Sequence, residues 1–184
     1  MEQFRVEKSV RAFIFDFEEF SKKTKQLFEC AVEVRKNAQA PYSNFYVGAA
    51  ALSAEGRIYA GCNVERVSWT QTTHAEQNAV DSMVAAEGPS KIQALVLAAA
   101  PKGEEIILGS KRDPAEKVSI EDIPVPCGHC LQIIWENCFD DGTVPLMSLL
   151  PDGRVTQVTI ADALPMRFGP TDLGVDYSKI RGQA

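Results

Sequence analysis

Two short motifs gather the residue types that bind metal ions, T-H-A-E-Q around His74 and P-C-G-H-C from residue 126 onwards. His74, Cys127 and Cys130 are three ligands of the kinds that zinc prefers, and three protein ligands leave a tetrahedral zinc one open position for water. A structural zinc site would normally be closed by a fourth protein ligand. Here Glu76, two residues after the histidine, can instead move protons beside that water. Together the motifs predict a catalytic zinc site that carries out hydrolysis.

Each motif alone has a simpler interpretation. A C-x-x-C pair such as Cys127 and Cys130 could be a redox pair or half of a zinc ribbon, but no second pair follows that would complete a ribbon. A lone histidine such as His74 would more often be a hydrogen-bonded core residue than a ligand. Their joint occurrence favours the metal site. We expect His129 to point away from the metal and the remaining cysteines to be small buried side chains: Cys30, Cys62 and Cys138.

Helical periodicity places both motifs at the start of a helix. Apolar residues recur at helical spacing over about 74–86, and Pro126 favours the start of a second helix over about 127–137. The positive end of a helix dipole and its unpaired N–H groups favour thiolate over thiol, so both cysteines of the second motif would ligate zinc readily near neutral pH. The sequence thus predicts a metal site between two helix N-termini.

The remaining segments predict the sheet that carries these helices. A further helix is predicted over about 16–37, and apolar runs of strand length follow at 45–52, 57–63, 92–100, 144–150 and 155–160. The order strand, helix, strand from 57 to 100 indicates a parallel crossover. We expect a single α/β domain over 16–184, with three layers and a mixed sheet of about five strands, preceded by an N-terminal extension at 1–15.

Composition and charge limit the class of partner. With 184 residues, 45% hydrophobic and 24% charged, the chain has the composition of an ordinary globular protein. Its net charge of -6 and the lack of a basic run argue against a nucleic acid polymer and favour a small-molecule substrate. No signal peptide or membrane-spanning run is recognisable, and five cysteines without an export signal favour reduced thiols and a cytoplasmic location.

Three further blocks extend the pattern beyond the metal motifs: A-P-Y-S-N-F-Y-V-G-A-A at 40–50, G-C-N-V-E at 61–65 and A-L-P-M-R-F-G-P-T-D-L at 163–173. With them, the chain resembles the cytidine deaminases over roughly 39–173. An H-x-E motif followed by P-C-x-x-C is also the signature of zinc deaminases in general. The resemblance implies the three-layer α/β/α cytidine deaminase-like fold, with Zn2+ held by the three ligands described above.

The resemblance also implies six residues that contact a nucleoside: Phe45, Asn63, Val64, Glu65, Ala75 and Phe168. Asn63 and Glu65 would hydrogen-bond the ribose 3'-hydroxyl, and Phe45 would pack against the base or the sugar. Phe168 would reach into the site of a neighbouring subunit. Without the resemblance, simpler interpretations stay open: Phe45 could belong to the core and Asn63 to a turn. Glu65 could be a solvated carboxylate, and Phe168 could pack the tail on its own subunit.

The implied reaction is the hydrolytic deamination of cytidine and deoxycytidine to uridine and deoxyuridine in pyrimidine salvage. Glu76 would take a proton from water, deliver it to N3 of the pyrimidine as C4 is attacked, and protonate the departing amine. The loop at 101–125 is longer than in compact members of the family and leads into the cysteines. N4-modified cytidines or a cytosine nucleoside antibiotic are therefore alternative substrates. A non-catalytic, zinc-stabilised nucleoside-binding module is the alternative from another class, and Glu76 argues against it.

Departures from the family pattern bear on the metal charge and on assembly. Compact members carry Cys where His74 stands and Arg at the positions of Gln77 and Leu131. Zinc with one neutral histidine and two thiolates is neutral and needs less compensation from arginine. The H-A-E-Q form resembles the larger dimeric members, yet this chain lacks room for their second domain. We therefore expect a homo-oligomer, and a tetramer rather than a dimer.

Overall fold

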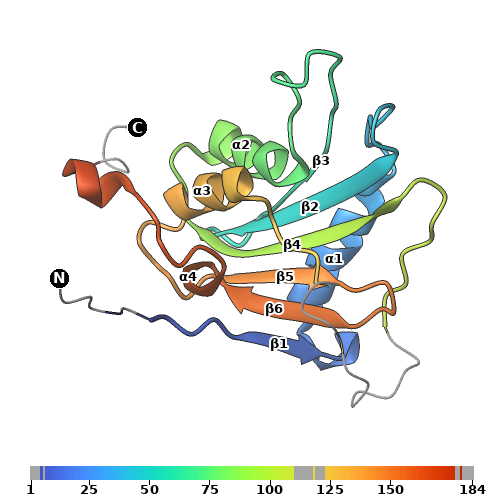
Figure 1. The fold of residues 1–184 in the computed structure, drawn as a ribbon, viewed down its shortest axis with the longest axis horizontal. Helices are drawn as coiled ribbons and strands as arrows, with labels where there is room; N and C mark the ends of the chain where they lie inside the picture. The colour runs from blue at the N-terminus through green and yellow to red at the C-terminus, as the bar shows by residue number, and fades with distance from the viewer. Residues whose placement is uncertain (1–4, 6, 110–117, 119–122, 177–178, 180–184) are drawn as a thin grey trace.

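A six-stranded mixed sheet forms the centre of the fold, in the strand order β1-β6-β5-β4-β2-β3 (Figure 1). The strands are β1 (Ala12–Phe15), β2 (Phe45–Ser53), β3 (Ile58–Cys62), β4 (Ile92–Pro101), β5 (Pro145–Leu149) and β6 (Val155–Thr159). The neighbours β4 and β5 run parallel, and the other neighbouring pairs among these strands are antiparallel. These elements belong to a computed structural model that describes residues 5, 7–109, 118, 123–176 and 179.

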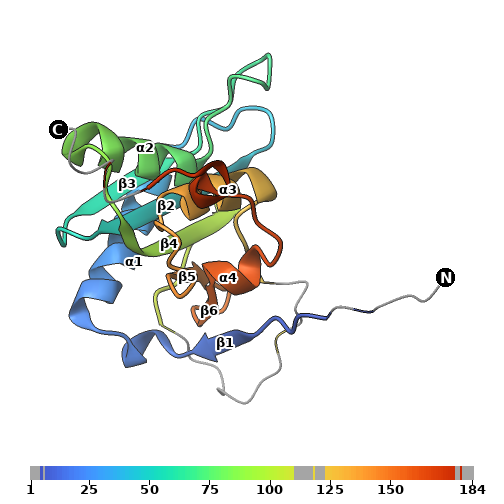
Figure 2. The same ribbon diagram turned by 90° about the vertical axis from the view of Figure 1, so that its left-hand side faces the viewer.

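Helices cover both faces of this sheet (Figures 1 and 2). Helix α1 packs on one face, and α2 and α3 lie side by side on the other. The helical elements are η1 (Phe17–Glu19), α1 (Lys22–Arg35), α2 (Ala75–Glu87), α3 (Gly128–Glu136), α4 (Ile160–Ala163) and η3 (Pro170–Leu173). One apolar core surrounds Phe28 of α1, and a second surrounds Met83 of α2 and Ile134 of α3. The three predicted layers are thereby confirmed. Among the described residues, no helix combines the length and the apolar character needed to cross a bilayer.

The sheet has six strands rather than about five, because the segment expected to be an N-terminal extension contributes β1. This strand pairs antiparallel with β6, from Ala12 opposite Val158 to Phe15 opposite Val155. It is only four residues long and lies at the edge of the sheet, with Phe13 55% exposed. A short, exposed edge strand lacks the alternation of buried and polar residues that marks a half-buried strand. The sequence of this segment therefore gave little indication of a strand.

Helix α1 begins later than its periodicity indicated. The prediction placed its start near residue 16, but the helix begins at Lys22 because Ser21 caps it, with the Ser21 hydroxyl accepting from the Thr24 N–H at 3.2 Å. Phe17 belongs instead to the preceding 3-10 turn, where its ring packs 5.8 Å from that of Phe28. The other two predicted helices, α2 and α3, and the five predicted strands lie within two residues of their expected bounds.

The predicted crossover brings the N-terminus of α2 to one end of the sheet. Strands β3 and β4 are each antiparallel to β2, so they run in the same direction with β2 between them. Gly61 lets α2 lie directly on β3, since a Cβ atom there would meet the backbone nitrogen of Ala79 at 2.4 Å. The carboxyl ends of β4 and β5 point to the same end as the N-termini of α2 and α3 (Figure 1). In open α/β sheets, this end is where ligands bind.

Candidate active site

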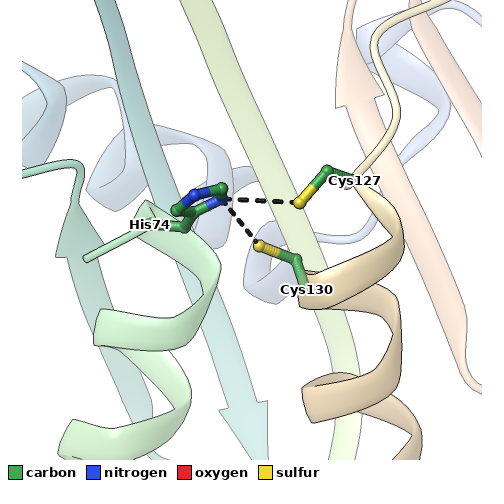
Figure 3. A group of neighbouring side chains, drawn as sticks. All are labelled: His74, Cys127 and Cys130. Atoms are coloured by element: carbon green, nitrogen blue, oxygen red, sulfur yellow. Dashed lines mark hydrogen bonds between the residues drawn. The ribbon is translucent and has the colours of Figure 1, made fainter. Parts of the chain in front are cut away.

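Three metal-ligating side chains meet where the N-termini of α2 and α3 face each other (Figure 3). The Nδ1 atom of His74 lies 3.5 Å from the sulfur of Cys127 and 3.3 Å from that of Cys130. With zinc bond lengths of about 2.1 Å to nitrogen and about 2.3 Å to sulfur, a tetrahedral site separates such ligands by about 3.6 Å. The three ligand atoms all lie within 4.8 Å of one another. The donor set and its spacing therefore fit a Zn2+ ion.

The local backbone explains why these side chains are free to converge. His74 is the N-cap of α2 and Cys127 the N-cap of α3, both with extended backbone, and neither side chain caps its own helix. Cys130 follows Cys127 by three residues, which places both sulfurs on one side of the first turn of α3. The prediction that both motifs stand at helix N-termini is confirmed.

The helix terminus does not by itself deprotonate the buried cysteine. Burial raises the pKa of the Cys130 thiol well above its ordinary value, and the Glu76 carboxylate and Cys127 raise it further. Desolvation of Cys130 therefore outweighs the helix dipole, which the sequence predicted would favour the thiolate. A bound cation would reverse this balance by stabilising the thiolate, which agrees with a site built for a metal ion.

A cavity of about 510 Å3 opens beside the three ligands. Seven of the residues singled out from the sequence line it: Phe45, Asn63, Glu65, His74, Ala75, Glu76 and Cys127. Glu76 stands in the first turn of α2 and lines the cavity. It is only 7% exposed, so little water reaches its carboxylate. A buried carboxylate beside a three-ligand metal group is suited to proton transfer.

Asn63 and Glu65 hold the rim of the cavity together through backbone contacts. The Glu65 carboxylate is 5% exposed and accepts from the N–H groups of Tyr42 at 2.9 Å and Ser43 at 3.2 Å. Burial alone would raise the pKa of Glu65, but hydrogen bonds from Ser43 and Tyr42 together lower it. The Asn63 amide accepts from the N–H of Val47 and donates to the carbonyl of Phe45, both at 2.9 Å. Neither residue fits its simpler interpretation as a turn residue or a solvated carboxylate.

Phe45 lies at the cavity wall and is 43% exposed, so it is not a core residue. Two further predicted contacts lie outside the cavity. Val64 pairs with Thr73 through its backbone N–H and C=O, and its side chain is not among the lining groups. Phe168 is 59% exposed on the C-terminal tail, beside Trp135 and away from the ligands of its own chain.

Several lining residues were missed by the sequence analysis: Ser43, Val47, Trp69, Thr72, Leu97, Ala99, Pro124 and Val125. Most have no reactive group and come from segments that only the fold brings together. Pro124 and Val125 directly precede the second metal motif, and that proximity could have identified them. Of the remaining cysteines, Cys62 and Cys138 are buried as expected, whereas Cys30 is only half-buried. His129 is exposed on the first turn of α3, with its ring 5.7 Å from that of His74.

The site combines one histidine and two cysteines with a buried glutamate, beside a cavity on an α/β sheet. This combination is typical of zinc-dependent deaminases. Residues 21–144 match the family described as the cytidine and deoxycytidylate deaminase zinc-binding region. The chain belongs to the cytidine deaminase family, and it is a hydrolytic deaminase. It is 34% identical over 142 residues to a cytidine deaminase of Sporosarcina psychrophila, which covers 77% of this chain and 88% of the relative.

Solved structures agree with this assignment. The crystal structure of a cytidine deaminase from Burkholderia pseudomallei matches with a TM-score of 0.60 and 30% identity, covering 78% of this chain and 98% of the other. That of a cytidine deaminase from Mycobacterium tuberculosis matches with a TM-score of 0.57 and 29% identity, covering 79% and 97%. A longer cytidine deaminase of Aliivibrio fischeri is 33% identical over 139 residues, which is 36% of its length. The chain therefore corresponds to nearly the whole of the compact relatives and to about a third of this longer one.

Proposed function

We propose that the enzyme converts cytidine and deoxycytidine to uridine and deoxyuridine with release of ammonia, as part of pyrimidine salvage in the cytoplasm. The observation that carries this proposal is the meeting of His74, Cys127 and Cys130 beside a nucleoside-sized cavity that buried Glu76 also lines. Zinc held by these three ligands would supply an activated water at neutral pH. The five cysteines are all unpaired, which supports a reducing compartment.

The protein's part in the chemistry is proton transfer by Glu76. Its carboxylate accepts one proton from the attacking water and delivers it to N3 of the pyrimidine, while the water oxygen bonds to C4. The second water proton passes to the amine as the C4–N4 bond breaks, so ammonia leaves and the carbonyl of uridine remains. The low exposure of Glu76 keeps competing water away from these transfers.

Asn63 and Glu65 would position the sugar. An ionised carboxylate offers about four lone-pair sites, so Glu65 can accept from a ribose hydroxyl while it holds the N–H groups of Tyr42 and Ser43. The Asn63 amide likewise keeps one N–H beyond its bond to Phe45. Phe45 would pack against the base or sugar, and Ala75 would line the floor beside His74. Because these groups contact parts of the substrate that do not react, they act by positioning.

We further propose that the enzyme is a closed homo-oligomer, a tetramer rather than a dimer, in which Phe168 completes a neighbour's cavity. The C-terminal segment exposes Met166 by 92%, Phe168 by 59% and Leu173 by 71%. Large apolar side chains exposed together on one segment are typical of an interaction surface. Light scattering at assay concentration tests this assembly, and an active monomer would contradict it.

The decisive test of the reaction is to incubate the purified, zinc-loaded protein with cytidine, deoxycytidine and cytosine and to follow loss of the cytosine absorbance and release of ammonia. Glu76→Gln keeps the shape of the side chain but removes the proton carrier. We expect this variant to retain zinc and bind nucleoside while its turnover falls by at least ~10²-fold. Wild-type protein that binds cytidine without converting it would instead indicate a non-catalytic binding module.

A further inference from the structure

A second cavity of about 230 Å3 adjoins the candidate active site, and we call it the side cavity. It shares three lining residues with the main cavity: Phe45, Ala99 and Pro124. The residues that line the side cavity alone include apolar groups from three segments, among them Ala100, Ile106, Leu149 and Leu150. The two cavities are therefore neighbours, with these three residues at their common boundary.

The walls of the side cavity are held by hydrogen bonds. The Arg35 guanidinium donates to the carbonyl oxygens of Tyr46 at 2.9 Å, Ala100 at 2.8 Å and Pro101 at 2.9 Å. It thereby ties the start of β2 to the end of β4. The N–H of Lys102 donates to the carbonyl of Asn44 at 2.8 Å, which fixes the chain just beyond β4. Hydrogen bonds therefore fix the backbone that bounds the side cavity, which lies at the carboxyl ends of the parallel strands β4 and β5.

The position of the metal ligands shows which part of a cytidine would face this space. To react, C4 of the base would have to lie close to Glu76 and the metal ligands, and Pro124, three residues before Cys127, lines both the main cavity and the side cavity. The sugar would lie near Asn63 and Glu65, which line the main cavity but not the side cavity. A substituent on the exocyclic amine at C4 would therefore point past Pro124 into the side cavity.

We propose, on the basis of that function, that the side cavity receives the substituent of N4-alkyl and N4-acyl cytidines, and that the enzyme hydrolyses them. The reaction needs no further reactant. Water adds its oxygen to C4, one of its protons goes to N3, and the other goes to N4 as the C4–N4 bond breaks. An N4-alkylcytidine thus yields uridine and an alkylamine, and an N4-acylcytidine yields uridine and a carboxamide.

The charge around the side cavity restricts the substituent. Glu104 and Glu105 line it and are both exposed, so their carboxylates stand where the cavity meets solvent. The remaining walls named above are apolar. Neutral apolar substituents therefore fit, while a substituent that ends in a carboxylate meets the like charges of Glu104 and Glu105, of which Glu104 interacts with the Arg35 guanidinium behind the wall.

The test compares cytidine with N4-butylcytidine, N4-butanoylcytidine and N4-(3-carboxypropanoyl)cytidine, following uridine and the released amine or amide. Ile106→Trp fills the side cavity, and Ala100→Leu fills it from another wall. Ile107→Trp is the matched control, since Ile107 is 50% exposed and does not line the cavity. We expect the wild type to hydrolyse the butyl and butanoyl substrates and to discriminate against the carboxylate. Each filling variant should lower kcat/KM for the butanoyl substrate by at least ~10-fold while cytidine turnover stays near wild type.

Several results would overturn the inference. One is a wild type that deaminates cytidine but none of the N4-substituted compounds, which leaves the proposed function intact. Another is a filling variant that lowers kcat/KM for cytidine and the butanoyl substrate in equal proportion, with Ile107→Trp doing the same. A side cavity that instead admits substituents at C5 would appear as a loss of 5-propylcytidine turnover in Ile106→Trp with no loss for the N4 series. Absence of cytidine turnover in the wild type would refute the proposed function itself.

Discussion

Replacing Glu65 by glutamine tests how the rim of the active site is held. The Glu65 carboxylate is almost fully buried and accepts two backbone N–H groups, from Tyr42 and Ser43. Hydrogen bonds to a charged group contribute about 1.5–3 kcal/mol, against about 1 kcal/mol for neutral ones. Glu65→Gln keeps the shape but loses the charge, so we expect a loss of about 1–2 kcal/mol of unfolding free energy. For a chain of this size, that corresponds to a fall in Tm of roughly 2–8 °C.

The same substitution should have a kinetic effect if Glu65 also accepts from the ribose. Weakening one charged hydrogen bond to the substrate by about 1.4 kcal/mol lowers kcat/KM about tenfold. The assay is thermal unfolding of zinc-loaded protein at pH 7 together with steady-state kinetics on cytidine. Glu29→Gln is the control, because Glu29 is exposed on α1. Unchanged Tm and unchanged kcat/KM in Glu65→Gln would refute the reasoning. A lower Tm with unchanged kcat/KM would show that Glu65 stabilises the rim of the cavity but does not bind the ribose.

The difference in unfolding free energy between the wild type and Glu65→Gln should change with pH in one direction. The pKa of Glu65 is lowered from its ordinary value of 4.5 in the folded protein, so the stabilisation from the ionised form is fully present above about that pH. It is lost as the pH falls through the lower folded pKa. The difference in unfolding free energy between wild type and Glu65→Gln should therefore shrink as the pH falls below 4.5. A difference that grows on acidification would contradict the assignment.

Three further predictions concern the metal, the assembly and the backbone. The purified protein should carry about one zinc per chain, and Cys127→Ser or Cys130→Ser should abolish both metal retention and activity, as measured by elemental analysis and turnover. Phe168→Ala should raise KM with unchanged zinc content if Phe168 completes a neighbour's site; lower Tm with normal kinetics would indicate packing on its own subunit. Gly61→Ala should cost about 1–3 kcal/mol in denaturant unfolding, because its Cβ would meet Ala79 nitrogen at 2.4 Å. Gly128→Ala, which meets nothing within 4 Å, is the control.

The sequence by itself determined the chemistry of the site and the order of its elements. His74, Glu76, Cys127 and Cys130 could be identified because ligand type and short spacing are local properties, and a metal ion accepts few combinations of them. The strands from residue 45 onwards were predicted to within a residue or two because buried strands carry continuous apolar runs. In contrast, β1 escaped prediction because an exposed edge strand has no such constraint.

Only the tertiary structure decided how the residues between the motifs are used. Glu65 and Asn63 were recognised as possible substrate contacts, but their hydrogen bonds to Tyr42, Ser43, Phe45 and Val47 join segments about twenty residues apart. The side cavity depends on Arg35 reaching carbonyl groups that lie up to 66 positions further along the chain. Such contacts follow from the packing of α1 across the ends of β2 and β4 and leave no periodic or local signal in the sequence. The reactive groups were therefore readable in advance, whereas the shape of the space around them was not.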